Sequence, residues 1–550
     1  MNSMKKFLQN QSSLLIILLL FSIMIWINFS WSQLSILEMK SIDEYAFHGS
    51  LLRFYEGLIK FDLKKIFSTG FYSYGSVFFI LNGMAAFPWL GETGSSFAII
   101  VPRLITTIFM VVSLFIMTKL VEQFHSNIFE KILALLFVVV MPGIWVNAMW
   151  FNPDYMMTAF LMASMYMLFR SNKIGDGFYW LSVLFWGISV AVKVQAITFA
   201  PVLIWSVWIM IRNKSESEHF VQILVASFVS IIIIFIILNP YVLHPKGANA
   251  WFQVFVSNIE SNASNHGRVG ELSLLFKIKN AIELFYVPLV LFILLLFLSL
   301  IAIYKEWKSK QLRLSGMAAA YILPNTLYLL FFVNKAWHHY YLPIFIMAPL
   351  IFSFGINLLR DRFSLNLIWL RATFILLVVT QIVAFSTTLK DLIELRLNGG
   401  AISADSINRY EPQIVYESDE SDKRKDVYEL IKEDLRHDSV ILKSPYLPFP
   451  FKDIGLSYGQ VRIIYGALSP AIFERRVSRS GIIQKEVSHI LIRKDDIYFD
   501  ENKIQMRVEY DAYKIAEKTI QQWILGKGRY RLIKQSSCCY LFEKNEEVRP

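Results

Sequence analysis

Residues 14–31, LLIILLLFSIMIWINFSW, are almost entirely apolar, and SIDEYAFHGS, residues 41–50, follows them with two adjacent carboxylates, Asp43 and Glu44. A helix needs roughly 20 apolar residues to span a bilayer. Residues 14–31 are therefore predicted to form a membrane helix, and the acidic pair lies just where the chain leaves the lipid.

The composition extends this prediction to most of the chain. Of its 550 residues, 55% are hydrophobic and only 18% are charged, which is more apolar than a soluble fold accommodates. We expect a polytopic α-helical membrane protein with about 11 transmembrane helices. The predicted spans are residues 14–31, 98–119, 132–149, 154–170, 178–192, 196–211, 220–239, 284–304, 316–333, 339–357 and 367–387.

Lysine and arginine set the predicted orientation, because cytoplasmic loops retain them. Lys5 and Lys6 hold the N-terminus inside, so the acidic pair emerges outside. Later basic loops carry Lys119 and Lys131, Arg170 and Lys173, Arg212 and Lys214, Lys305 to Arg313, and Arg360 and Arg362. Because successive helices alternate in direction, all of these loops are cytoplasmic only if the chain is outside both before residue 38 and after residue 97. Residues 73–90, SYGSVFFILNGMAAFPWL, are thus predicted to lie in the interface and not to cross.

Two domains are predicted. Residues 1–387 form the membrane domain, with a retained first helix and external loops at 38–97 and 241–283. Residues 388–550 are charged and alternate between strand-like runs such as DSVILKSPY and helical patterns such as KRKDVYELIKEDLRH. This pattern predicts an extracytoplasmic α/β domain.

Several function classes are disfavoured by the sequence. The net charge of +11 is explained by Lys and Arg in cytoplasmic loops, so no nucleic-acid partner is predicted. There is no Gly-rich phosphate loop, paired CxxC or HExxH, so the sequence requires no cofactor and shows no metal site, although a divalent metal can assist at a phosphate. The only cysteines, Cys538 and Cys539, are neighbours and say little about the redox compartment.

The first candidate site is the acidic pair itself. Carboxylates just beyond a membrane helix are usually only solvated. Here FHGSLLRFYEGLIKFDLKKIF, residues 47–67, follows with an amphipathic pattern suited to lying on the membrane surface above a site. Partial desolvation there would raise the pKa of the Asp43 or Glu44 carboxylate toward the range that suits a general base.

The second candidate is Asp154 in MWFNPDYMM, residues 149–157. Asn152 or Asp154 can simply cap the helix that follows, with Pro153 in its first turn. The predicted topology nevertheless puts Asp154 on the same outer face as Asp43, so the two acids can meet at one site.

The third candidate is basic. VNKAWHHYYLP, residues 333–343, places Lys335, His338, His339 and Tyr340 at an outer membrane boundary, and Lys193 lies at another. Aromatic residues there are ordinary interfacial anchors, and a lysine can snorkel to the headgroups. Cations at that depth also suit an anionic phosphate. Adjacent histidines point in different directions, which disfavours a shared metal.

The order of these segments resembles the integral-membrane glycosyltransferases of the GT-C superfold. The segments are the external Asp-Glu pair, FYSYGSVFFILNG, PRLITTIF, WFNPDYMMTAFLMASMYMLF, GISVAVKVQAITFAPVLIW and HHYYLPIFIMAPL. The chain is most similar to the protein O-mannosyltransferase and lipid A aminoarabinose transferase group, over roughly residues 10 to 390. The resemblance implies that Asp43 acts on the acceptor, that Asp154 is the acid of a later helix, and that basic residues bind the phosphate of a polyprenyl-phosphate sugar.

Two departures bear on the carrier site. Tyr74, Gly75, Ser76 and Val77 replace the Tyr-Pro-Pro-Leu common in that group, and His339 and Tyr340 replace an Arg-Tyr. The second departure leaves the identity of the phosphate ligand open.

The function expected is inverting sugar transfer from a polyprenyl-phosphate donor to an extracytoplasmic lipid, glycan or protein hydroxyl. The expected location is a bacterial plasma membrane. One alternative is a transporter or flippase of lipid-linked substrates, which predicts ionisable groups near mid-membrane and often related halves. Another is a polysaccharide polymerase or ligase that uses diphosphate-linked donors.

Overall fold

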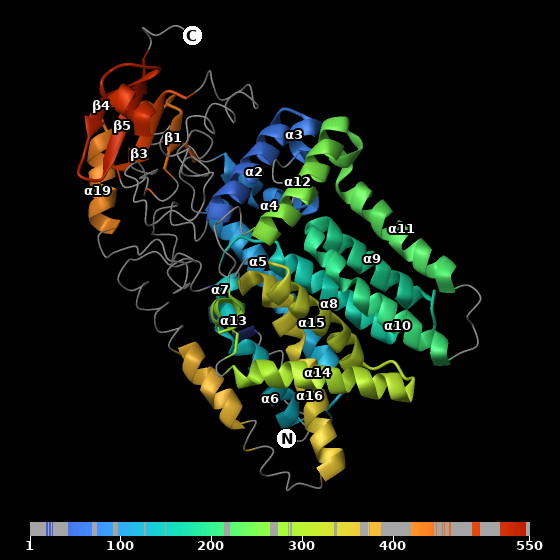
Figure 1. Cartoon of the computed structure of the whole chain (residues 1–550). Coiled ribbons are helices and arrows are strands. Elements are labelled where there is room, and N and C mark those ends of the chain that lie inside the picture. Colours follow the sequence, from blue (N-terminus) through green and yellow to red (C-terminus); the bar gives the residue numbers. More distant parts are fainter. Residues whose placement is uncertain are drawn as a thin grey trace, which may run out of the picture.

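The structure is a computed structural model. It describes residues 18–19, 21–23, 25, 42–68, 74–91, 97–125, 128–148, 150–213, 220–264, 273–283, 285–286, 289–334, 338–363, 372, 375–386, 420–444, 447, 454, 456, 461–463, 487–494 and 517–545. Helices form one large bundle, and a small sheet with a covering helix lies at one end of it (Figure 1).

Long apolar helices build the bundle. Six are long and apolar enough to cross a membrane, and one bent pair adds a seventh candidate, among the described residues. The helices of the bundle are α5 (Phe97–Val121), α6 (Ile128–Val139), α7 (Pro142–Ala148), α8 (Asp154–Arg170), α9 (Gly177–Val192), α10 (Ala200–Asn213), α11 (Phe220–Leu238), α14 (Val290–Ser309), α15 (Leu314–Phe331), α16 (Leu342–Phe363) and Ile375–Ser386. The chain is an integral membrane protein. Each predicted span after the first coincides with a helix or with the bent pair, whereas residues 14–31 lie mostly outside the described part.

The bent pair is α6 with α7, which meet at 60°. Pro142 begins α7, where its missing N–H leaves no hydrogen bond unmade. Every residue of α7 is buried. The bend therefore directs the segment after α7 into the interior, where it meets α5 and leads into α8.

The predicted external segments contain short helices. Residues 38–97 include α2 (Ile42–Ile59), α3 (Leu63–Phe67) and α4 (Ser76–Leu90). Phe61 has φ 51°, a left-handed turn that ends α2, and the Asp62 side chain then caps α3 by accepting from Lys65 N at 3.1 Å. With 15 residues, α4 is one of the shorter apolar helices, as are α9 and Ile375–Ser386.

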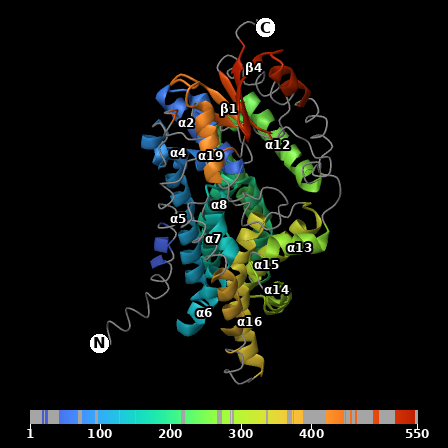
Figure 2. The ribbon, with the colours of Figure 1, turned by 90° about the vertical axis from the view of Figure 1, so that its left-hand side faces the viewer.

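Residues 241–283 hold α12 (Pro245–Ser264) and α13 (Leu274–Ile282), and η3 (Pro240–Leu243) precedes them. Figure 2 shows α2, α4 and α12 at the same end of the bundle as the C-terminal sheet.

The C-terminal region is an α/β unit, as predicted. Its strands are β1 (Ile441–Lys443), β2 (Val461–Ile463), β3 (His489–Arg493), β4 (Tyr530–Gln535) and β5 (Cys539–Lys544), in the order β2-β1-β3-β5-β4. β1 pairs parallel with β2 and β3, and β5 pairs antiparallel with β3 and β4. The predicted boundary at residue 388 lies outside the described residues.

The two faces of this sheet belong to different cores. Because side chains alternate along a strand, Ile441 and Leu491 join the large cluster that continues through the bundle, whereas Leu442 and Ile490 join a smaller cluster. Helix α19 (Glu420–Ile431) contributes Val427 to the large cluster. One sheet face is thus continuous with the core of the membrane domain.

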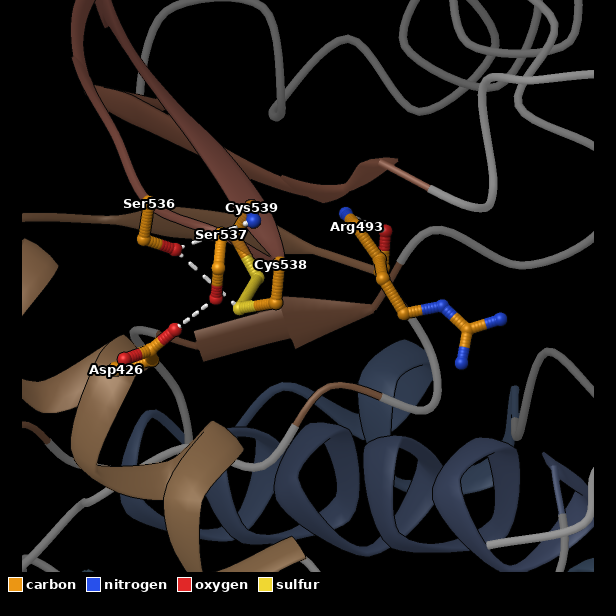
Figure 3. The surroundings of a disulfide bond; sticks show 7 residues. Asp426, Arg493, Ser536, Ser537, Cys538 and Cys539 are labelled. Atoms are coloured by element: carbon orange, nitrogen blue, oxygen red, sulfur yellow. Dashed lines mark hydrogen bonds between the residues drawn. A yellow bond between two sulfur atoms is a disulfide. The ribbon is translucent and has the colours of Figure 1, made fainter. Parts of the chain in front are cut away.

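Cys538 and Cys539 are joined by a disulfide at the start of β5 (Figure 3). The Ser536 hydroxyl lies 3.4 Å from the Cys538 sulfur, and Ser537 donates to Asp426 of α19. These contacts tie the β4–β5 turn to the helix that covers the sheet.

Candidate active site

Glu44 is buried in an ion pair in the first turn of α2. Arg103 of α5 donates from Nε to one Glu44 oxygen at 2.7 Å and from a terminal nitrogen to the other at 2.8 Å. The backbone N–H of Phe151, after α7, donates to the first oxygen at 2.8 Å. Both partners are at most 4% exposed. Glu44 therefore fixes the first turn of α2 to α5 and to the α7–α8 segment.

Asp43 precedes Glu44 in the same turn, but its side chain lies outside the described part of the structure. Its backbone position is nevertheless set, since the neighbouring Glu44 is held by three donated hydrogen bonds.

His48 lies one turn after Glu44 and is also buried, with 4% of its surface exposed. Burial lowers its pKa to about 4, since desolvation disfavours the charged imidazolium; the Glu44 charge opposes this shift, and Arg103 adds to it. His48 is consequently neutral at physiological pH.

The second ion pair joins α8 to α9. Lys193, at the end of α9, donates to Asp154, the first residue of α8, at 2.6 Å. Asp154 is 1% exposed and Lys193 is 5% exposed. Lys193 therefore does not snorkel to the headgroups. Of the two capping candidates, Asn152 accepts from Asp154 N at 3.0 Å, so Asn152 supports the start of α8 and leaves the Asp154 carboxylate to Lys193.

Two tyrosine rings flank the Lys193 ammonium. Its nitrogen lies 5.5 Å from the centre of the Tyr74 ring and 5.4 Å from that of Tyr340. Both distances suit cation–π attraction. Lys193 thus contacts Asp154 and both rings.

The segment around Gly75 holds Tyr74 in this place. Tyr74 and Lys193 form an antiparallel β-bridge, and Gly75 N donates to Val192 O at 2.9 Å. A Cβ at Gly75 would lie 1.5 Å from Ala191 O. Only glycine allows this approach of two backbones, which gives a structural reason for the departure from Tyr-Pro-Pro-Leu.

Lys193 of the second ion pair belongs to a closed series of ring–ring and cation–ring contacts, which we call the aromatic circuit. Its members are Phe47, Tyr74, Lys193, Tyr340, His339 and Trp150.

Around the rest of the circuit, the Phe47 ring centre lies 4.9 Å from that of Tyr74 and 6.5 Å from that of Trp150. His339 completes it, 4.7 Å from Tyr340 and 6.1 Å from Trp150. Phe47 is on α2, so the circuit joins the helix of the acidic pair to Lys193.

The basic segment before α16 is placed only in part. His338, His339 and Tyr340 form η4 (His338–Tyr341), and His338 is buried whereas His339 and Tyr340 are half-buried. The rings of the two histidines are inclined by 85°. Lys335 lies outside the described residues.

Within the part of the chain that the structure describes, no three His, Cys, Asp or Glu side chains gather as a metal site. The structure brings together most of the predicted residues: Glu44, Asp154, Lys193, His339 and Tyr340 all lie on the aromatic circuit or in ion pairs beside it.

Arg103, Phe47 and Trp150 were not predicted as site residues from the sequence. For Arg103 a signal was present, because an arginine within an apolar run is costly in lipid and implies a partner. The two aromatic residues carry no such signal, since their composition is ordinary for a membrane protein.

Solved structures of similar fold are known for this chain, although its sequence has no match among family models or curated proteins. The structure of ArnT from Cupriavidus metallidurans bound to undecaprenyl phosphate is similar over 97% of this chain and 98% of that chain, with 10% identity and a TM-score of 0.57. The apo structure of the same protein matches over 96% and 98%, with 10% identity and a TM-score of 0.53. The likeness confirms the GT-C membrane fold that the resemblance predicted.

Proposed function

We propose that this chain transfers a sugar from a polyprenyl-phosphate donor to an extracytoplasmic hydroxyl on a lipid, a glycan or a protein. The observation that carries the proposal is the aromatic circuit, which joins the acidic turn of α2 to the buried Lys193. A hydroxyl acceptor needs a base, and a departing phosphate needs a cation. The ArnT structure of the same fold is bound to undecaprenyl phosphate, which supports a carrier of this class.

In the proposed reaction, Asp43 accepts the proton of the acceptor hydroxyl. The hydroxyl oxygen forms a bond to the anomeric carbon of the sugar while the bond from that carbon to the phosphate oxygen breaks. The electron pair of the broken bond stays on the phosphate, which remains attached to the polyprenyl chain. Attack from the face opposite the phosphate inverts the anomeric centre.

Lys193 stabilises the charge that develops on the departing phosphate. An ammonium carries three N–H donors, and Asp154 accepts one of them. The other two have no hydrogen-bond partner among the described residues, so they can bind phosphate oxygens without loss of the ion pair. Asp154 holds the cation in position, and the rings of Tyr74 and Tyr340 limit its movement.

We assign further phosphate or carrier contacts to the segment before α16. His339 and Tyr340 are on the aromatic circuit and half-buried, and the proposal includes Lys335 and His338 of the same segment. A divalent metal can supplement these cations at the phosphate.

Glu44 has a different role from Asp43. Both of its oxygens accept hydrogen bonds from Arg103, and one also accepts from Phe151 N. A carboxylate occupied in this way is a poor base, so we propose that Glu44 positions Asp43.

Sugar transfer from a panel of radiolabelled polyprenyl-phosphate monosaccharides tests the proposal, in membranes that contain the wild type, Asp43→Asn or Asp62→Asn at matched expression. Asp62 is a matched control, because it caps α3 in the same segment and asparagine caps equally well. We expect loss of transfer only in Asp43→Asn. Transfer that survives this substitution would remove Asp43 from its role. A wild type inactive with every donor would favour the transport or diphosphate-donor alternatives.

A further inference from the structure

A second feature lies at the end of the bundle opposite to the aromatic circuit. Helix α10 starts just after Lys193 and η2 (Val194–Phe199), and it ends with Arg212 in its last turn. Its 14 residues extend about 20 Å at 1.5 Å per residue. Helices α10 and α14 both pack on α15 (Figure 1). The end of α14 lies beside Arg212, which donates to the Trp307 carbonyl.

These three helices line an open apolar groove of about 550 Å³. Pro201, Ile204, Trp205, Trp208, Trp307 and Pro324 are among its lining residues. Ile204 is 48% exposed and Trp307 is 50% exposed, so the groove opens onto the surface that faces lipid. A volume of this size is in the range that holds a drug-sized ligand, about 300–1,000 Å³.

Arg212 sits at the mouth of the groove between two tryptophans. Its guanidinium carbon lies 4.7 Å from the ring centre of Trp208 and 4.7 Å from that of Trp307. It also donates to the Trp307 carbonyl at 3.4 Å. Among the residues that the structure describes, no carboxylate pairs with Arg212, which is half-buried and has further donors to offer.

Three further cations lie near Arg212 among the residues that the structure describes. Lys308, Lys310 and Arg313 are exposed between α14 and α15. The nearby carboxylate, Glu306, is fully buried and accepts from Trp205 Nε1 at 3.2 Å. The exposed charges described beside the groove are therefore cationic, and the wall of the groove is apolar.

We propose that this groove binds one anionic phospholipid of the adjoining leaflet. Its phosphate contacts Arg212, and one acyl chain lies along the tryptophan-lined wall. Interfacial Trp and Arg residues commonly anchor membrane helices singly. Here the ring centres of Trp208 and Trp307 lie 4.4 Å apart, and the Arg212 guanidinium contacts both rings beside the groove. A basic residue beside an apolar groove between helices suits an anionic lipid. The proposal does not depend on the reaction at the aromatic circuit.

Native mass spectrometry of the purified full chain, titrated with phosphatidylglycerol or phosphatidylcholine, tests this site. The variant is Arg212→Gln, and the matched control is Arg170→Gln. Arg170 ends α8 with its guanidinium carbon 5.9 Å from the Phe178 ring, which is not a lining residue of the groove, whereas Arg212 contacts the lining residues Trp208 and Trp307. We expect the wild type and the control to bind one phosphatidylglycerol about fivefold more tightly than phosphatidylcholine. Arg212→Gln is expected to bind both equally.

A second measurement needs no substitution. Brominated phosphatidylglycerol should quench the tryptophan fluorescence of the wild type more than brominated phosphatidylcholine at the same mole fraction, and inorganic phosphate should not displace it. Equal binding of the two lipids by the wild type would overturn the proposal. So would equal losses in both variants, displacement by inorganic phosphate, or a lipid-free dimer in which a second copy covers the groove.

Discussion

The buried pair of Glu44 and Arg103 offers a quantitative test of how α2 is held. Both side chains are at most 4% exposed, and the contacts are 2.7 and 2.8 Å. Removal of one partner leaves a buried charge uncompensated, which destabilises a protein by about 3–5 kcal/mol. We therefore expect Arg103→Met and Glu44→Gln each to accelerate unfolding strongly.

The double variant Glu44→Gln/Arg103→Met carries no buried charge at this position, so it should recover part of the loss. The expected coupling is at least about 1 kcal/mol, within the range found for residues in contact. Membrane proteins often unfold irreversibly, so the assay compares unfolding rates of the purified variants in detergent at one temperature. Glu56→Gln is the control, because Glu56 is 45% exposed in its pair with Lys65 and should lose less than about 1 kcal/mol. Strictly additive effects of the two core substitutions would refute the reasoning.

Three further predictions concern the same region. Lys193→Met should reduce sugar transfer by about 100-fold or more. It should also destabilise the protein, and the double variant Lys193→Met/Asp154→Asn should recover stability but not transfer. If the double variant recovered both, Lys193 would have only a structural role. Gly75→Ala should destabilise by about 1–3 kcal/mol, because the new Cβ would meet a backbone carbonyl at 1.5 Å; the control Gly49→Ala, with nothing within 4 Å on α2, should not, and equal unfolding rates would contradict this. His48 has its pKa lowered from 6.5 to about 4, so the unfolded chain binds the extra proton first and stability falls as the pH drops from 6.5 to 4, by about 3 kcal/mol in total. The unfolding rate of His48→Gln should therefore increase less between pH 6.5 and pH 4 than that of the wild type. The same pH dependence in both proteins would exclude this role of His48.

The membrane helices could be predicted from local patterns in the sequence. Spans such as Phe97–Val121 are long and apolar enough to be recognised without any knowledge of their neighbours. The alternation of the basic loops predicts that α4, an apolar helix of 15 residues, does not cross the membrane, and this stays a prediction.

The pairing of charges is not visible in the sequence. Asp154 and Lys193 were each singled out, but their contact spans 39 residues and depends on how α8 packs against α9. Glu44 and Arg103 are 59 residues apart, and only the helix bundle brings them together. The β2-β1-β3-β5-β4 order is also beyond local patterns, because parallel pairing joins distant segments.

In the proposed function, the bond between the sugar and a polyprenyl phosphate is broken at the active site of this protein. The most direct measurement uses proteoliposomes or native membranes, a donor labelled in both sugar and phosphate, and a count of free polyprenyl phosphate against newly glycosylated product. The account predicts one polyprenyl phosphate released per sugar transferred, with the anomeric configuration inverted, and neither product with Asp43→Asn. Movement of the intact donor across the bilayer without cleavage, or release of a diphosphate, would contradict it.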